Sequence, residues 1–175
     1  MPDPASTFES AHPDTLAQIR KEADAYLGAQ LTVTLAGNQR AMTFFGFLAA
    51  ASAVIGSASV TVVTTSTDFA AFGVVGIMVV FGLLIAMFCA NMAAMPDDFY
   101  YVGNSPSNWI EDIQDGRRLH RSLAEGVALD VRSIDRNTDT IDRCSKFIKR
   151  AVWIAWGSLA GGALGMIVAY SLTHP

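Results

Sequence analysis

The chain has 175 residues, of which 51% are hydrophobic and only 16% are charged, well below the roughly one quarter typical of soluble domains. Its net charge is −4, and the basic stretch 117–150 follows an acidic stretch at 97–115, so the two are expected to pair with each other rather than with nucleic acid. Charged residues are absent from 41–67, 69–96 and 151–174, and each block exceeds the about 20 residues needed to cross a bilayer. Three buried helices of a soluble bundle are the alternative, but buried core segments are usually shorter, so we predict three transmembrane helices.

The residues before the first apolar block predict a tail followed by a helix. Prolines and short polar residues make 1–14 a flexible tail. In 15–40 the apolar residues recur at intervals of three and four, which is typical of an amphipathic helix, here a cytoplasmic one. No proline intervenes before Arg40, so this helix is expected to run directly into the first membrane span at 41–66. The first forty residues contain no secretory signal, so we expect this span to be retained and to direct insertion.

The second span is predicted at 69–95, where Pro96 ends it, and an interfacial loop is predicted at 96–106. Aromatic side chains gather at this boundary: Tyr100, Tyr101 and Trp109. One interpretation is a recognition loop for a ligand or partner. The other, which we favour, is an aromatic belt at the lipid head groups, where amphipathic rings are stabilised.

A cytoplasmic helical segment is predicted at 107–150, because Ser105 and Pro106 form a good helix start and no further proline precedes the third span. This helix can continue into that span, with Gly116 and Gly126 as the expected hinges. Positions from 127 to 152 follow a heptad seam, spaced alternately by four and three, and two of its members, Thr138 and Ser145, are polar. Its apolar members include Val127, Val131, Ile134, Ile141 and Ile148. The cytoplasmic part should therefore be helical, either as an intramolecular bundle with the N-terminal helix or as a helix shared between subunits.

The third span, predicted at 151–172, carries glycine at every fourth position of one face: Gly157, Gly161 and Gly165. In lipid, helices associate through close backbone approach rather than through the hydrophobic effect, so this double GxxxG pattern predicts a helix-packing face. The plain alternative is that transmembrane helices are richer in glycine than soluble ones. The first span offers a second surface of small residues, with Gly46 and Gly56. Whether the partner is another copy, another span or a different protein stays open.

All 12 Lys and Arg residues lie before the first span or between the second and third. Those next to the ends of spans carry the most information about orientation: Arg40, Lys146, Lys149 and Arg150. The positive-inside rule places such residues in the cytoplasm, where they also meet anionic lipid head groups. We therefore predict a multi-pass protein of the cell membrane, expected to be a bacterial inner membrane. Its N-terminus lies in the cytoplasm and its C-terminus lies outside.

No motif in the sequence predicts catalysis. Metal-ligand spacings, phosphate-binding loops and nucleophile motifs are missing, so no catalytic residue, cofactor or metal is assigned and we expect the protein not to be an enzyme. The stretch 135–140, DRNTDT, resembles half of a calcium loop, but Thr140 and Lys146 replace the required glycine and glutamate. No ionisable side chain lies inside a predicted span, which disfavours ion-coupled transport and acid–base catalysis within the membrane.

The order of an amphipathic cytoplasmic helix, a hairpin of two spans and a long cytoplasmic helix over 15–150 resembles the layout of small prokaryotic membrane effectors of the SLATT and Pycsar type. That resemblance implies damage to the membrane when a nucleotide signal is sensed. It concerns architecture and no diagnostic motif. The third span departs from a two-span pattern, and no fused nucleotide-sensing domain is present, so any trigger would come from elsewhere.

The predicted fold is that of an all-α integral membrane protein with three transmembrane helices. Its helical cytoplasmic part is formed by the N-terminal helix and the long helix that precedes the third span. The leading hypothesis for function is a self-associating protein, as an oligomeric pore or membrane effector. The alternatives are an accessory subunit of a larger membrane complex and, less favoured, a dimeric half-transporter.

Overall fold

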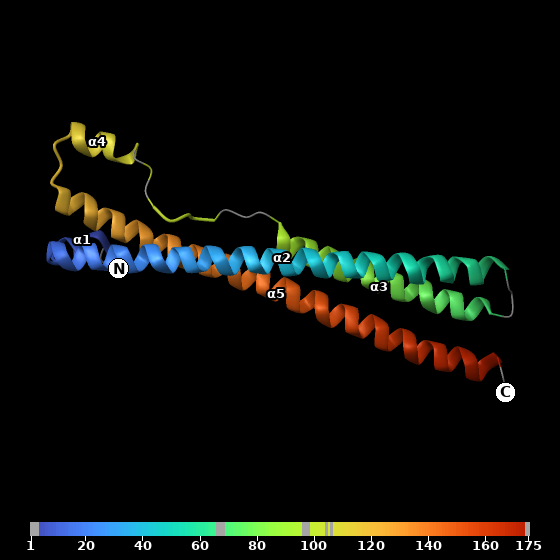
Figure 1. The fold of residues 1–175 in the computed structure, drawn as a ribbon. Coiled ribbons are helices and arrows are strands. Elements are labelled where there is room, and N and C mark those ends of the chain that lie inside the picture. Colours follow the sequence, from blue (N-terminus) through green and yellow to red (C-terminus); the bar gives the residue numbers. More distant parts are fainter. Residues whose placement is uncertain (1–3, 66–68, 96–98, 104, 106, 174–175) are drawn as a thin grey trace. The chain divides into compact units, whose positions relative to one another are not determined.

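Every regular element in the described part of the chain is an α-helix. The computed structural model describes residues 4–65, 69–95, 99–103, 105 and 107–173. The helices are α1 (Pro4–Glu9), α2 (Pro13–Thr65), α3 (Ala70–Ala94), α4 (Asn108–Gln114) and α5 (Leu119–Thr173), as Figure 1 shows. Three of them, α2, α3 and α5, are long and apolar enough to cross a membrane. The predicted all-α fold with three candidate spans is confirmed at this level.

The ends of α2 and α3 follow from their local sequence. α2 begins at Pro13, where a missing N–H does no harm, and Asp14 lies in its first turn near the positive end of the helix dipole. It continues without interruption to Thr65, so the N-terminal helix and the first span form one helix. α3 ends where Met95 adopts an extended backbone with ψ of 135°, the conformation favoured before a proline.

The helix predicted to continue from the loop into the third span is interrupted between α4 and α5. Gly116 has φ of +63°, in the left-handed region that glycine occupies at little cost. Its N–H donates to the carbonyl of Ile113 at 3.3 Å, and the N–H of Arg117 donates to the carbonyl of Asp112 at 2.9 Å. These two bonds end α4 in a Schellman motif. Gly116 is thus one of the two expected hinges, whereas α5 runs through Gly126 without a break.

The segment predicted as a flexible tail contains a helix. α1 occupies Pro4–Glu9, and Phe8 and Ala11 pack against a buried cluster formed by Leu16, Ala124 and Val127. Burial of these two side chains stabilises the segment. The sequence of the segment itself is mostly polar, so it could not predict that residues distant in the chain would cover Phe8 and Ala11. Residues 1–3 of the predicted tail lie outside the described residues.

The chain divides into two compact units. The polar unit takes its described residues from Met1–Leu35 and Asp97–Asp142, and the apolar unit takes them from Ala36–Pro96 and Arg143–Pro175. The core of the polar unit is the cluster that packs on α1. The apolar unit has its own core, which joins α2, α3 and α5 and consists of Leu48, Val79, Leu83, Ala86 and Ala155.

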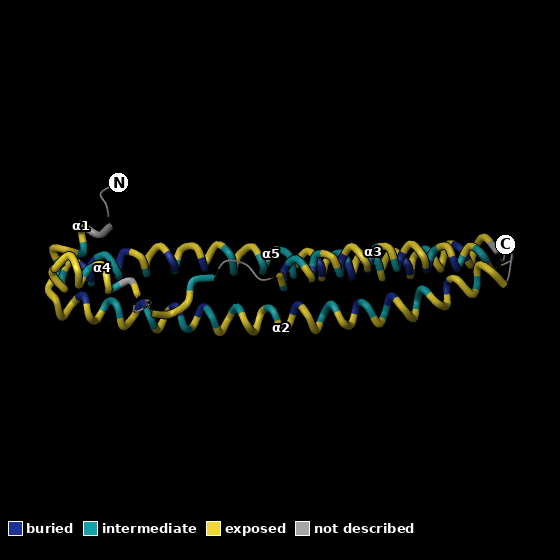
Figure 2. Tube along the Cα trace, turned by 90° about the horizontal axis from the view of Figure 1, so that it is seen from above, coloured by how far each residue is buried: buried dark blue, intermediate teal, exposed yellow. Residues whose placement is uncertain are grey.

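Burial in the apolar unit is confined to narrow stripes. In the most apolar 18-residue window of each candidate span, 28% of α3, 17% of α2 and 11% of α5 is buried. Buried positions recur singly between exposed ones along these helices in Figure 2. Large apolar side chains face outward, such as Phe47 at 70% and Trp153 at 77% exposure. Most of the apolar surface of these three helices is therefore left uncovered within one chain.

Gly116 has a positive φ whereas Gly37 has a helical backbone, so replacing each by alanine should change stability in opposite directions. Gly116→Ala should destabilise the protein by about 1 kcal/mol, because a side chain at positive φ is strained. Gly37 lies inside α2 with no described neighbour within 4 Å of an ideal Cβ, so Gly37→Ala should stabilise it by up to about 1 kcal/mol. Thermal unfolding in lipid nanodiscs, followed by circular dichroism, measures both, and shifts of the same sign would contradict this interpretation.

Candidate helix-packing face and cavity

Glycines in the apolar unit mark places where a neighbouring helix lies directly against the backbone of α3 or α5. Four of them leave no room for a methyl group, because an ideal Cβ would collide with a neighbouring helix. The colliding pairs are Gly73 with Val63, Gly76 with Ser59, Gly82 with Ser158, and Gly162 with Val79. These pairs join α3 to α2 and to α5. Close backbone approach of this kind supplies van der Waals contact that holds helices together where no hydrophobic effect acts.

The glycines predicted to form packing faces differ in their surroundings. An ideal Cβ on Gly165 would lie 3.0 Å from Cγ1 of Val75 in α3, and one on Gly56 would lie 3.7 Å from Cγ2 of Val80. Three others have no described neighbour within 4 Å of an ideal Cβ: Gly46, Gly157 and Gly161. The predicted glycine face of α5 is therefore divided, with one member against α3 and two uncovered.

Sequence reasoning missed three of the four most crowded glycines: Gly73, Gly76 and Gly82. Gly73 and Gly76 lie one turn apart on α3, and Gly162 stands next to the predicted face of α5. Their spacing was visible in the sequence. Glycine spacing does not say which side of a helix meets a neighbour, however, because that depends on the positions of the other two spans.

The predicted cytoplasmic seam of α5 packs partly within the chain. Val127 is fully buried in the core of the polar unit, whereas Val131 is 36% exposed. The side-chain Nε2 of Gln30 in α2 donates to the carbonyl of Ile134 at 3.1 Å and to the hydroxyl of Thr138 at 2.9 Å. The two remaining seam residues are partly buried: Ile141 and Ile148. Contact between copies through the seam stays a prediction.

A buried amide holds the segment after α3 onto α5. Asn137 is fully buried; its Oδ1 accepts from the backbone N–H of Tyr100 at 2.9 Å, and its Nδ2 donates to the carbonyl of Tyr100 at 3.0 Å. Arg136 donates to the hydroxyl of Tyr100, and its guanidinium lies 5.5 Å from the centroid of that ring. We call these contacts the Asn137 latch. They fix the position and direction of Tyr100 on the helix.

The residues predicted for the lipid interface fall into two groups. Tyr100, in the latch, and Trp109, whose ring centroid lies 5.9 Å from the Arg20 guanidinium, both contact helices of the polar unit. Tyr101 is 70% exposed. The basic residues are all exposed as well: Arg40, Lys146, Lys149 and Arg150. For these exposed residues, contact with head groups stays a prediction.

A cavity of about 310 Å³ lies in the polar unit, within the size range of small-molecule sites. Arg20 of α2 lines it together with Leu129, Asp130 and Ser133 of α5. The aromatic residues 99–101 and the small residues Gly103, Ser105 and Gly126 complete the lining. Burial raises the pKa of the Asp130 carboxyl; the Arg20 guanidinium opposes that shift and the Asp24 carboxylate adds to it. A carboxyl with a perturbed pKa in a cavity is a candidate for function.

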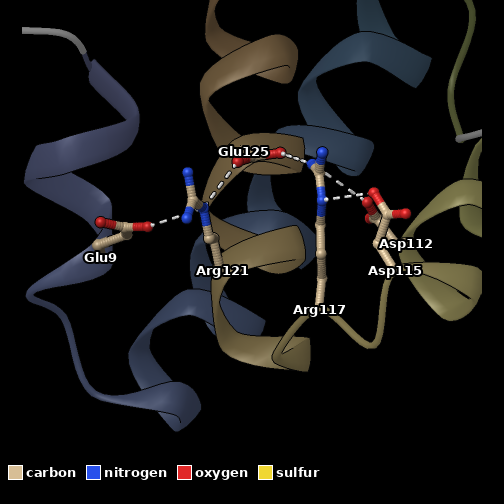
Figure 3. A network of polar contacts seen from close by, with 6 residues as sticks. All are labelled: Glu9, Asp112, Asp115, Arg117, Arg121 and Glu125. Carbon is tan, nitrogen blue, oxygen red and sulfur yellow. Dashed lines mark hydrogen bonds and ion pairs between the residues drawn. The ribbon is translucent and has the colours of Figure 1, made fainter.

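Charged side chains at one end of the polar unit form an alternating network, shown in Figure 3. Its pairs are Arg117 with Asp112 at 3.3 Å, with Asp115 at 3.7 Å and with Glu125 at 3.4 Å, and Arg121 with Glu125 at 3.2 Å and with Glu9 at 3.4 Å. The expected pairing of the acidic stretch with the basic one is confirmed at Arg117. Such exposed pairs contribute about 1 kcal/mol or less each, so the network ties α1 and α4 to α5 without dominating stability.

Among the described residues, no group of three or more His, Cys, Asp and Glu side chains is placed to hold a metal ion. No protein family, curated protein or solved structure matches this chain. Function is therefore inferred from the packing face and the cavity.

The raised pKa of Asp130 predicts a stability that depends on pH. Folding raises the pKa of this carboxyl above 3.8. The ionised carboxylate therefore lowers the stability of the fold once the pH exceeds the pKa of the unfolded state, and the full cost is present above the pKa of the folded state. Asp130→Asn should therefore raise the thermal midpoint at about pH 7 and change it little at about pH 3, where the carboxyl is protonated in both states.

Asp135→Asn, at an exposed carboxylate of the same helix, is the matched control and should show no such difference between the two pH values. A midpoint that falls at neutral pH with Asp130→Asn would show that the ionised carboxylate stabilises the fold instead.

Proposed function

We propose that this chain is a non-enzymatic membrane protein that crosses the bilayer three times and self-associates through the face of α5 that carries Gly157 and Gly161. The assembly acts as an oligomeric pore or membrane effector. The observation that carries the proposal is the uncovered state of these two glycines beside neighbouring glycines that are tightly packed.

Support for insertion comes from the surface of the apolar unit. Its helices satisfy their backbone hydrogen bonds internally, which is what hydrocarbon requires of any segment that crosses it. Their outward side chains are mostly apolar, and exposed hydroxyls such as those of Thr61 and Thr64 donate to backbone carbonyls of their own helix. The parts of α2 and α5 proposed to span, 41–65 and 151–172, contain no charged residue. Lipid is the solvent that matches such a surface.

Support for orientation comes from the basic residues that flank the spans. Arg40 precedes the first span and Arg150 immediately precedes the third, whereas the few residues after the third span contain no Lys or Arg. The positive-inside rule then puts the polar unit in the cytoplasm and the C-terminus outside, in the inner membrane of a bacterium.

Support for association comes from the cost of glycine in a helix. Each glycine inside a helix is about 1 kcal/mol less favourable than alanine in water. At Gly162 and Gly165 that cost is offset by contact with α3. At Gly157 and Gly161 no contact within the described chain offsets it, and a second copy that approaches along this face would do so.

The chemistry of the spans favours a pore or effector over a transporter. The proposed spans carry no Asp, Glu, His, Lys or Arg side chain, which ion-coupled transporters usually keep near mid-membrane. The layout of cytoplasmic helix, hairpin and cytoplasmic helix resembles that of small membrane effectors. In an accessory subunit, the same face of α5 would meet a different protein.

Two adjacent glycines give a sharp test of self-association. Gly161→Ile adds a side chain at a position where an ideal Cβ has no described neighbour within 4 Å, so the monomer should fold normally while the oligomer is lost. Ala163→Ile, at an exposed position on another side of α5, is the matched control and should leave the oligomer intact. Gly162→Ile meets Val79 and should disturb the helix packing within each chain.

Native mass spectrometry from nanodiscs measures the oligomer, and circular dichroism measures the helical content. We expect the association constant of Gly161→Ile to fall about tenfold or more, which corresponds to a loss of about 1.4 kcal/mol or more. An oligomer that resists Gly161→Ile would refute self-association through this face. Stoichiometric co-purification of a different chain, lost on the same substitution, would identify an accessory subunit instead.

A further inference from the structure

The cavity of the polar unit presents different hydrogen-bonding groups on its two helices. On α2, the guanidinium of Arg20 offers only donors. On α5, Asp130 and Ser133 line the cavity less than one turn apart. A ligand that fills the space must therefore satisfy donors on one side and the groups of α5 on the other.

The α5 side of the cavity offers acceptors. The hydroxyl of Ser133 already donates to the carbonyl of Leu129 at 2.9 Å, so its oxygen is left to accept. Oδ2 of Asp130 is shielded from solvent and has no hydrogen-bond partner among the described residues. A shielded carboxylate oxygen without a donor is costly, so a donor from outside the chain, from water or from a ligand, would stabilise this side of the cavity.

Arg20 is positioned by packing on both sides. Its guanidinium lies 5.9 Å from the centroid of the Trp109 ring, and Nη1 lies 3.5 Å from where a Cβ on Gly126 would be. Glycine in the interior of α5 costs about 1 kcal/mol relative to alanine. At Gly126 it gives the guanidinium a place close to the backbone of α5, beside the cavity.

Aromatic rings form the third wall. The Asn137 latch holds Tyr100, and the ring of the next residue, Tyr101, lines the cavity while remaining 70% exposed. Gly103, just beyond these rings, has φ of +93° and lies in a bend of the backbone. An exposed ring beside a cavity offers a stacking surface to a flat ligand.

The groups around the cavity carry charges of both signs, so a ligand ion of either sign would meet at least one group that repels it. Arg20 would repel a cation. The carboxylate of Asp24, which raises the pKa of Asp130, and the Asp130 carboxyl itself would disfavour an anion. The remaining class is an uncharged ligand that uses these groups through hydrogen bonds.

We propose that this cavity binds a small uncharged planar ligand, an aromatic lactam or amide in chemical class. The ligand donates a hydrogen bond to Asp130 or Ser133, accepts one from Arg20 and stacks on Tyr101. All of these residues belong to the polar unit, whereas Gly157 and Gly161 belong to the apolar unit. This binding therefore does not depend on association through the two glycines.

The test uses the full chain in nanodiscs and carbostyril as the probe. Carbostyril is a planar aromatic lactam with its carbonyl and N–H on one edge, and N-methylcarbostyril lacks the donor. Isothermal titration calorimetry should show saturable binding of carbostyril to the chain. N-methylation of the probe, Arg20→Gln or Asp130→Asn should each weaken that binding about tenfold or more, as expected for the loss of a charge-assisted hydrogen bond. Lys21→Gln, at the exposed neighbouring position, should leave the affinity unchanged.

Empty nanodiscs measure partition of the probe into lipid, and circular dichroism confirms that each variant keeps its helices. The comparison of the two lactams on the unmodified protein needs no variant and decides the donor requirement alone. Absence of saturable binding to the chain, equal affinity for both lactams, or tighter binding of benzoate or benzyltrimethylammonium at this site would overturn the proposal.

Discussion

The apolar side chains on α2, α3 and α5 that the chain leaves uncovered must be kept away from water, and the rest of the structure depends on this constraint. In water, each square ångström of such surface costs about 25 cal/mol, whereas in hydrocarbon it costs nothing. At most 28% of any candidate span's most apolar window is buried within the chain. If lipid supplies the remaining contacts, the hydrophobic effect no longer holds these helices to each other, and close fit between small residues takes its place.

The two units are stabilised in ways that match two solvents. The polar unit uses a small apolar core, the buried amide of Asn137 and the charge network around Arg117, all typical of a protein surrounded by water. The apolar unit uses glycines that let backbones approach, such as Gly76 against Ser59 and Gly82 against Ser158. Gly157 and Gly161 have the same chemistry but no described neighbour, which is why they are the proposed contact with a second copy.

Periodicity and missing charge predicted the three long helices, because both depend only on neighbouring residues. The continuity of α2 was predictable for the same reason, since no proline lies between 14 and 65. The latch on Tyr100 and the crowding at Gly162 were not, because each depends on residues far apart in sequence. The sequence predicted a hinge at Gly116. It did not predict that this glycine ends α4 with φ of +63°, because glycine can adopt both positive and negative φ. For the cavity, the only signal in the sequence was the cluster of aromatic residues at 99–101, which line it.

Contact between tryptophan and brominated acyl chains tests most directly whether lipid is the solvent of the apolar unit. Trp153 and Trp156 of α5 are 77% and 66% exposed, and the variant Trp109→Phe removes the one tryptophan of the polar unit. In bilayers of lipids brominated along the chain, this variant should lose most of its fluorescence relative to the same bilayers without bromine. Undiminished fluorescence, from a chain that also stays folded in buffer without lipid or detergent, would contradict a membrane-spanning apolar unit.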